Sequence, residues 1–261
     1  MLKPSLQIAI IQSDIVWENP EKNIAHFNQK FKNLPLTTDL VILPEMFTTG
    51  FSMNPHRLSE TMNGQSVSWM QQWAIRNQIA ICGSLIISEQ SNYYNRFVFV
   101  YPNGEIKHYN KRHLFSIAGE HKMYTAGSSQ TIVNYKEWKL SLQICYDLRF
   151  PVWSRQSKSN YDALIYVASW PTPRIHAWDT LLKARAIENM CYCIGANRVG
   201  KDANGHAYPG HSAIYDALGN TINFSNREEI ILATLTYDTL SQLRIKLPFY
   251  NDSDEFVLIK S

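Results

Sequence analysis

The chain alternates nearly continuous apolar stretches of strand length with amphipathic stretches of helix length, and this alternation restricts the folds it can adopt. Leu6–Gln12 and Ile79–Ile87 are apolar over most of their length, which is typical of buried strands. Asn19–Leu34 instead repeats its apolar residues at helical spacing, with Asn19 as a predicted N-cap before Pro20. The pattern therefore predicts strands that are connected by helices and packed against them.

The remaining segments add hairpins to this pattern. Two hairpins are predicted at Tyr94–Lys111, which contains a Pro-Asn-Gly turn, and at Gln130–Ile144. Further helices are predicted at Ser66–Gln78 and Arg174–Asn189. Further strands are predicted at Asp39–Glu45, Asp162–Ser169, Cys191–Val199, His211–Asp216, Asn220–Phe224 and Glu228–Tyr237. Because hairpins are mixed with strand–helix units, we predict an α/β fold with two sheets, in the order of a four-layer α-β-β-α sandwich.

Length and charge limit the domain organisation and the partners. The 261 residues contain no repeat, no low-complexity segment and no linker rich in Pro, Gly or Ser, so we expect one domain over residues 1–261. A formal net charge of +3 without a block of like charges argues against nucleic-acid binding and a polybasic membrane anchor. The amino-terminal apolar run is too short for a signal peptide or a membrane span, which predicts a soluble cytoplasmic protein.

Four cysteines, Cys82, Cys145, Cys191 and Cys193, raise the question of disulfides or a metal site. A disulfide framework is expected in short secreted chains, whereas this chain is long and shows no secretion signal. Cys191 and Cys193 form a Cys-Tyr-Cys run in an apolar segment, where a metal pair is conceivable. We favour two buried thiols there, because no Cys-x-x-Cys motif or histidine partner lies nearby.

Three predicted strands are followed by a reactive side chain: Glu45, Lys111 and Cys145. Each alone is a weak signal, since an acid after a strand is usually solvated and a cysteine within a strand is usually a core residue. Together they are the groups that a covalent amidase needs. A carboxylate can take the thiol proton, while an ammonium favours the thiolate and stabilises the oxyanion that forms on attack at a carbonyl. We therefore predict that the three side chains converge at one rim of the sheets.

The sequence around these three residues is similar to that of a known family. LPEMFTTGF, YNKRHLF and ICYDLRFPVW resemble, in the same order, the three signature segments of the nitrilase, or carbon–nitrogen hydrolase, superfamily. GHSAIYDALG and ARAIEN also match its pattern, so the resemblance covers nearly the whole chain. The resemblance implies a Glu-Lys-Cys triad on Glu45, Lys111 and Cys145, with Cys145 as the nucleophile on a strand-to-helix elbow.

The resemblance also implies an activity. Within the superfamily the sequence most resembles the bacterial omega-amidases, which hydrolyse the terminal amide of 2-oxoglutaramate or 2-oxosuccinamate to the 2-oxo acid and ammonia. The implied route passes through a cysteine thioester and needs no cofactor. Lys111 and the backbone N–H of Tyr146 would hold the oxyanion. A second glutamate of the family matches Glu120, by its spacing to Gly127, and is expected on a loop. The family's usual assembly is a homodimer.

The substrate side of the site leaves alternatives open. Arg149 either pairs with Asp147 or offers its planar fork to the carboxylate of a 2-oxo acid amide. Arg174 is a second candidate for that carboxylate. Phe47 and Trp170 follow strands at the same rim, where they would form pocket walls or belong to the core or a dimer interface.

Other chemistries are disfavoured by what accompanies the triad. His113 would be the base of a Cys-His mechanism, but a glutamate can do this work, so we expect a structural hydrogen bond. The sequence shows no metal-ligand spacing, nucleotide-binding glycine motif or serine nucleophile elbow, which predicts an enzyme without metal or cofactor. Two rivals remain: a hydrolase of another small amide, a nitrile or an N-carbamoyl amine, and a non-catalytic dimeric binding module, which the intact triad disfavours.

Overall fold

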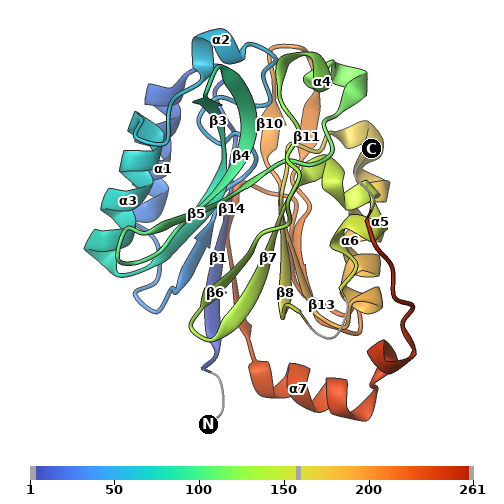
Figure 1. The fold of residues 1–261 in the computed structure, drawn as a ribbon. Helices are drawn as coiled ribbons and strands as arrows, with labels where there is room; N and C mark the ends of the chain where they lie inside the picture. The colour runs from blue at the N-terminus through green and yellow to red at the C-terminus, as the bar shows by residue number, and fades with distance from the viewer. Residues whose placement is uncertain (1–3, 157–159, 259–261) are drawn as a thin grey trace.

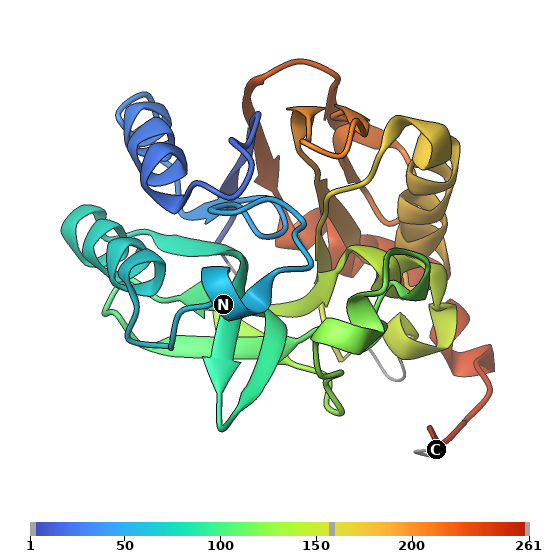
Figure 2. The same ribbon diagram turned by 90° about the horizontal axis from the view of Figure 1, so that it is seen from above.

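Two six-stranded sheets lie face to face at the centre of the molecule (Figure 1). The computed structural model describes residues 4–156 and 160–258. Helices cover the outer face of each sheet, and the view from above shows the same four layers in cross-section (Figure 2). The predicted α-β-β-α sandwich is therefore confirmed. The first three residues of the amino-terminal segment, where no signal peptide was expected, lie outside the described ranges.

The first sheet has the strand order β14-β1-β2-β3-β4-β5. Strands β1, β2 and β3 run parallel, whereas β14, β4 and β5 are added by antiparallel pairing. Helices α1 (Pro20–Phe31) and α3 (Gln65–Asn77) cover its outer face, and the side chain of Asn19 caps α1 by accepting the Lys22 N–H at 3.0 Å. The strands are β1 (Leu6–Gln12), β2 (Leu40–Ile42), β3 (Ala80–Glu89), β4 (Asn92–Val100), β5 (Ile106–Asn110) and β14 (Glu229–Leu235).

The second sheet has the order β13-β12-β9-β8-β7-β6 and is parallel in its centre, from β7 to β9. Helices α5 (Pro151–Ser154) and α6 (Ile175–Glu188) lie on its outer face. The strands are β6 (Ile132–Tyr135), β7 (Trp138–Ile144), β8 (Ala163–Val167), β9 (Tyr192–Ala196), β12 (Ser212–Tyr215) and β13 (Thr221–Ser225).

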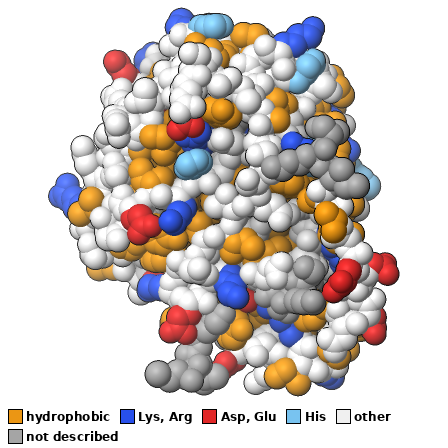
Figure 3. All heavy atoms as spheres, viewed as in Figure 1, with side chains coloured by type: hydrophobic (Ala, Val, Ile, Leu, Met, Phe, Trp, Pro, Cys, Tyr) orange, Lys and Arg blue, Asp and Glu red, His pale blue; other side chains and the backbone are white. Residues whose placement is uncertain are grey.

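Three apolar clusters hold the layers together. The largest lies between the sheets and is built from inward-facing residues of both, such as Ile10, Phe99, Leu142 and Ile165. A second packs α1 and α3 on the first sheet, and a third packs α6 on the second. Charged side chains of both signs are scattered over the face shown in Figure 3, without a block of one sign. Over residues 4–156 and 160–258, no helix has the length and apolar character needed to cross a membrane.

The structure corrects several predicted boundaries. Tyr237, assigned to the last strand, is the first residue of a further helix, α7 (Tyr237–Lys246). Only Leu240 of this helix is buried, so its sequence lacks the periodic apolar signal by which helices are recognised. The predicted strand Cys191–Val199 divides into β9 and β10 (Val199–Lys201). Strand β10 pairs with β11 (Ala207–Pro209) in a separate two-stranded sheet above the sandwich.

Short elements at the upper rim complete the fold and, apart from the turn that begins at Cys145, were not predicted. Because most of them span only three to five residues, they carry no periodic signal. They are α2 (Pro55–Leu58), η1 (Ser116–Ala118), α4 (Glu120–Met123), η2 (Cys145–Arg149) and η3 (Thr172–Arg174), with η4 (Phe249–Asp252) near the carboxyl end of the chain.

Candidate active site

The three predicted reactive residues meet at the upper rim, where strands of both sheets end. Lys111 directly follows β5 and Cys145 directly follows β7. Glu45 comes three residues after β2, which is shorter than the predicted strand. Since β2 and β5 belong to one sheet and β7 to the other, the groups come together only because the sheets face each other.

Lys111 is the charged centre of this cluster. Its side chain is fully buried, and Nζ donates to Glu45 Oε1 at 2.8 Å and to Glu120 Oε1 and Oε2 at 3.1 and 3.0 Å. Burial by itself lowers the pKa of an ammonium group, but the attraction of Glu120 and then of Glu45 prevails and raises the pKa of Lys111. The lysine is therefore held as a cation at neutral pH.

Glu120 is drawn into the cluster from the connection between the two sheets. It begins the short helix α4 and is fully buried, so the expectation of a loop position is corrected. Its carboxylate also accepts the backbone N–H of Phe115. Burial and the neighbouring Glu45 raise the pKa of Glu120, against the lowering effect of Lys111. Two carboxylates thus share one ammonium without access to solvent.

Cys145 occupies a strained backbone position at the end of β7. Its φ is +44°, in the left-handed region that residues other than glycine rarely adopt, and it begins the 3-10 helix η2. Met46, the residue after Glu45, is likewise left-handed, with φ of +46°. Such strain persists only when the surroundings enforce it, and it gathers at functional sites. The predicted elbow is present, in 3-10 rather than α-helical form.

The Cys145 thiol differs from the other three thiols in its neighbours. Burial and the charge of Glu45 raise the pKa of Cys145 well above its usual range, although Lys111 and the Ser169 N–H lower it. Burial also raises the pKa values of Cys82, Cys191 and Cys193. Those three sit in the core, whereas Cys145 is partly exposed and lines a cavity. The raised pKa favours the neutral thiol, so Cys145 would need a base in order to act as a nucleophile.

Asp147 stabilises the turn at Cys145 through several hydrogen bonds. Its buried carboxylate accepts the backbone N–H of Ile144 at 3.0 Å and the Tyr109 hydroxyl at 2.8 Å. It also accepts the backbone N–H of His113 at 2.9 Å, and His113 Nδ1 lies 2.8 Å from it. The structural hydrogen bond expected for His113 is present. Asp147 thereby connects the segment after β5 to the nucleophile turn.

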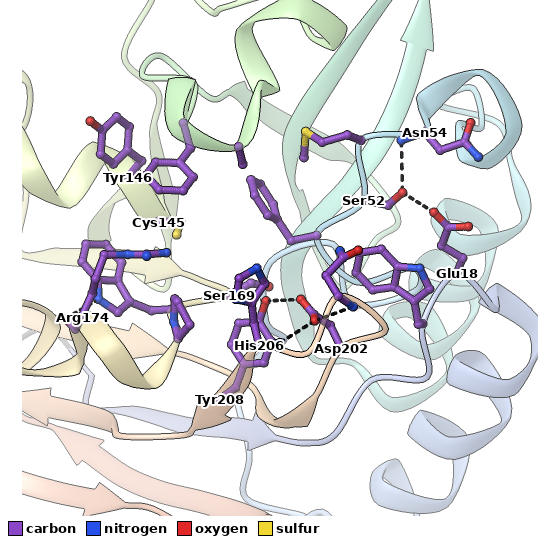
Figure 4. A pocket seen from close by; sticks show the side chains of 18 of the residues that line it. Glu18, Ser52, Asn54, Cys145, Tyr146, Ser169, Arg174, Asp202, His206 and Tyr208 are labelled. Atoms are coloured by element: carbon purple, nitrogen blue, oxygen red, sulfur yellow. Dashed lines mark hydrogen bonds between the residues drawn. The ribbon is translucent and has the colours of Figure 1, made fainter.

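A cavity of about 550 Å³ opens in front of Cys145. Figure 4 shows Cys145 and Arg174 at one end of it and Glu18 at the other. The hairpin formed by β10 and β11 contributes Asp202 and His206 to the wall. The volume falls in the range of small-molecule sites in proteins.

Arg149 and Arg174 both line this cavity. The guanidinium carbon of Arg149 lies 5.1 Å from the centre of the Trp170 ring, and that of Arg174 lies 5.1 Å from the Phe115 ring. Among residues 4–156 and 160–258, neither guanidinium pairs with a carboxylate within 4 Å. The alternative that Arg149 pairs with Asp147 is therefore wrong, because the Asp147 oxygens are occupied by other donors.

Of the two aromatic residues proposed as walls, only Trp170 lines the cavity. Its indole also packs on Trp178, so it belongs to the core and to the wall. Phe47 is fully buried between Phe27 and Trp69, with ring centres 5.4 and 5.9 Å away, and it does not reach the cavity. Phe47 lies two residues after Glu45, and its ring packs on the outer face of the first sheet, toward α1 and α3.

Two residues that contact the Glu45 carboxylate were not predicted from the sequence. Asn95, on β4, donates from Nδ2 to Glu45 Oε1 at 2.8 Å and to Glu120 Oε1 at 3.1 Å. Ser169, two residues after β8, donates its backbone N–H to Glu45 Oε2 at 2.8 Å. The residue type gave little signal for Asn95, because it lies next to Arg96 in the more polar first half of β4. Ser169 acts through its backbone, which leaves no signal in the residue type.

Over residues 4–156 and 160–258, no three His, Cys, Asp or Glu side chains are grouped so that they could hold a metal ion. The cluster of Lys111 with Glu45 and Glu120 is instead arranged around an ammonium, which fills the place between the two carboxylates.

Comparisons with known proteins agree with this geometry. The family model described as carbon-nitrogen hydrolase matches residues 7–245. The chain is 42% identical to omega-amidase YafV of Yersinia enterocolitica, over 98% of this chain and 99% of the relative. It is 32% identical to 2-oxoglutaramate amidase of Bacillus subtilis, over 94% and 96% of the two chains.

Solved structures give the same result. A carbon–nitrogen hydrolase superfamily protein of Xanthomonas campestris, with an arsenic adduct in its active site, superposes with a TM-score of 0.95. It is 38% identical, and the match covers 98% of this chain and 99% of the other. An amidase of Nesterenkonia superposes with a TM-score of 0.80 at 21% identity, over 94% and 95% of the two chains, which is a likeness of fold.

Proposed function

Because the chain belongs to the carbon-nitrogen hydrolase family, we propose that it is an omega-amidase that hydrolyses the terminal amide of 2-oxo dicarboxylic acid monoamides. The products are the 2-oxo acid and ammonia. One observation carries the proposal: a buried carboxylate–ammonium cluster adjoins a partly exposed thiol, which faces a cavity containing two arginines without carboxylate partners among the described residues.

The first step is attack by Cys145 on the amide carbonyl. Since the pKa of the thiol is raised, the proton must leave as the carbon–sulfur bond forms. We assign Glu45 as the base, because its carboxylate lies close enough to the thiol to influence its ionisation. The Ser169 N–H contacts Glu45 Oε2 and also influences the thiol, so Oε2 is the oxygen on the thiol side.

We assign the oxyanion to two donors, the Lys111 ammonium and the backbone N–H of Tyr146. Lys111 makes three contacts to carboxylate oxygens, two of them to Glu120. When the two Glu120 oxygens share one N–H, another remains for the substrate oxygen. Tyr146 follows the nucleophile in the first turn of η2, where backbone N–H groups have no partner inside the helix.

The later steps reuse the same groups. Glu45 returns its proton to the amide nitrogen and the carbon–nitrogen bond breaks. Ammonia departs, and a thioester remains on Cys145. Glu45 then removes a proton from water, whose oxygen attacks the thioester carbonyl. The carbon–sulfur bond breaks, Glu45 returns the proton to the sulfur, and the 2-oxo acid leaves. Glu120 keeps Lys111 in place throughout.

We propose that Arg149 and Arg174 bind the carboxylate of the substrate, with Trp170 as a wall. A guanidinium stacked on an aromatic ring keeps its edge free for a carboxylate, to which it can donate two parallel hydrogen bonds. The names of the relatives from Yersinia and Bacillus agree with an acidic amide as substrate.

A panel of amides tests the proposal. Ammonia release is measured with 2-oxoglutaramate, 2-oxosuccinamate, a neutral aliphatic amide, a nitrile and an N-carbamoyl amine, with Cys145→Ala as the blank. We expect the two 2-oxo acid amides to have the highest kcat/KM. A higher kcat/KM with the nitrile or the carbamoyl amine would assign the protein to another activity of the family. No ammonia from any of them would favour the binding module.

Assembly and location complete the proposal. We propose a homodimer, as the family resemblance predicts, and a cytoplasmic location, with a free small molecule as the substrate and neither nucleic acid nor membranes as partners. Size-exclusion chromatography with light scattering tests the assembly, because a dimer has twice the 30.1 kDa of the chain. A mass of one chain at micromolar concentration would contradict it.

A further inference from the structure

Asn95 stands out as the one uncharged side chain that contacts both buried carboxylates of the site among the described residues. It lies within β4 and is fully buried. Its two amide N–H groups point to different carboxylates, with Nδ2 at 2.8 Å from Glu45 Oε1 and 3.1 Å from Glu120 Oε1. Its backbone carbonyl accepts the Lys111 N–H at 3.0 Å. One residue thus contacts all three members of the cluster.

The carbonyl oxygen of the Asn95 amide shows which contacts orient this side chain. Asn95 Oδ1 is buried and has no hydrogen-bond partner among the described residues. A buried acceptor without a partner costs stability. Turning the amide over would be worse, because Oδ1 would then face two carboxylate oxygens. The side chain is therefore oriented by its N–H groups, and an unpaired carbonyl is tolerated for the sake of the carboxylates.

The hydrogen bond from Asn95 gives the two carboxylate oxygens of Glu45 different partners. Lys111 and Asn95 both donate to Glu45 Oε1, which leaves Oε2 to the Ser169 N–H on the thiol side. Without Asn95, the Lys111 ammonium would be the only described donor to Oε1 of either carboxylate. The Glu45 carboxylate could then rotate toward Lys111 and withdraw Oε2 from Cys145.

We infer that Asn95 is a positioning residue for the base of this reaction: it donates one N–H to each carboxylate and holds Glu45 Oε2 toward Cys145. The inference rests on the proposed roles of Glu45 and Cys145. It assigns Asn95 no contact with the substrate, since Asn95 does not line the cavity. Other titratable groups that influence the two carboxylates are Lys111, Cys145, Tyr124 and Tyr208.

Two substitutions separate positioning from a merely structural role. Asn95→Leu removes the donors and the unpaired carbonyl, and we expect kcat to fall about 10–100-fold with KM within about twofold. A donor favours the ionised carboxylate, so its loss moves the acid limb of the pH–rate profile to higher pH. Asn95→Asp supplies a donor, one O–H, only when the new carboxyl group is protonated. Its activity relative to wild type should therefore rise as pH falls.

Alkylation of Cys145 by iodoacetamide gives a readout that needs no substrate. Its pH–rate profile should shift in Asn95→Leu as the kinetic profile does, even if the amide substrate is misassigned. Asn92→Asp, on the same strand but exposed, is the matched control and should leave both profiles unchanged. Thermal melts identify variants that are unfolded. A folded Asn95→Leu with wild-type kcat and an unmoved acid limb would overturn the inference, as would a loss confined to KM.

Discussion

The two halves of the site differ in how they meet the solvent. The half contributed by the first sheet, with Glu45, Asn95 and Lys111, is fully buried and its charges are paired. The half contributed by the second sheet carries Cys145, partly exposed, and opens to the cavity beside Arg149. The closed half has one geometry, set by hydrogen bonds among its own members. The open half keeps donors that no described carboxylate satisfies.

This difference separates two tasks. A buried ion cluster must be satisfied internally, because an unpaired charge in the interior is very costly. It can therefore do the same chemistry for any amide. We expect substrate choice to belong to the open half, where guanidinium groups without described carboxylate partners and aromatic walls can be changed at little cost to the fold. Changes in the closed half should affect all substrates equally, and changes in the open half should discriminate among them.

The largest expected effect comes from the nucleophile. Cys145→Ala should lower kcat/KM by at least about 10⁴-fold for every substrate, because no thioester can form. Cys145→Ser should be nearly as inactive, since an alkoxide is far harder to form than a thiolate. Kinetics with a thermal melt measure both variants.

A matched control is Cys193→Ala, which removes a core thiol. It should lower stability and leave activity intact. Peptide mapping after treatment with a thiol reagent should find Cys145 labelled before Cys82, Cys191 or Cys193, which are buried. Retained hydrolysis in Cys145→Ala would end the mechanism.

Lys111→Met tests the closed half and should show the next largest loss. Removing one oxyanion donor typically costs about 10²–10³ in kcat, and the loss should be similar for acidic and neutral amides. A loss below about tenfold would make Lys111 structural and return attention to His113.

Stability of the same variant should depend on pH. Without the ammonium, two buried carboxylates face each other, so their folded-state pKa values should lie above the unfolded ones. A carboxyl group with a raised folded-state pKa destabilises the protein as pH rises above its unfolded value. The melting temperature of Lys111→Met should therefore lie well below that of wild type at pH 7, and the difference should shrink as the pH is lowered to about 5. A constant difference would contradict the sealed charge cluster.

The arginines test the open half, with a smaller and selective effect. Arg149→Met and Arg174→Met should each raise KM for 2-oxo acid amides and affect a neutral amide much less. A charge-assisted hydrogen bond contributes about 1.5–3 kcal/mol, which corresponds to about 10–100-fold discrimination. Arg149→Lys keeps the charge and loses the fork, so its effect should be intermediate. Equal losses for both kinds of substrate would remove that arginine from carboxylate binding.

The smallest effect on activity is expected for Phe47, which lies outside the open half of the site. Phe47→Leu is a core substitution that should cost about 1 kcal/mol and lower the melting temperature by a few degrees. Its KM should stay within about twofold of wild type. Trp170→Leu, the matched change at the cavity wall, should raise KM instead. A raised KM in Phe47→Leu would show that the core between the first sheet and its helices also shapes the pocket.

Much of this molecule could be predicted from local sequence. The apolar runs and helical periods located most strands and long helices to within a few residues, because burial imposes those periods on the sequence. Glu45, Lys111 and Cys145 were found because each reactive residue lies at or near the end of a strand. Helix α7 and the rim helices were missed, since they bury too few residues to leave a period. The sequence left Phe47 open between the pocket wall and the core, because position after a strand does not say to which side a ring turns.

The sequence by itself determined the chemical groups and their order along the chain. Only the tertiary structure decided which groups touch. Glu45 and Cys145 are 100 positions apart and lie on different sheets, and no local pattern encodes the contact between two faces. Asn95 was invisible for the same reason, because its role depends on two carboxylates that other segments deliver. Packing of one sheet against the other creates the buried environment, and burial turns ordinary side chains into a charge cluster with fixed geometry.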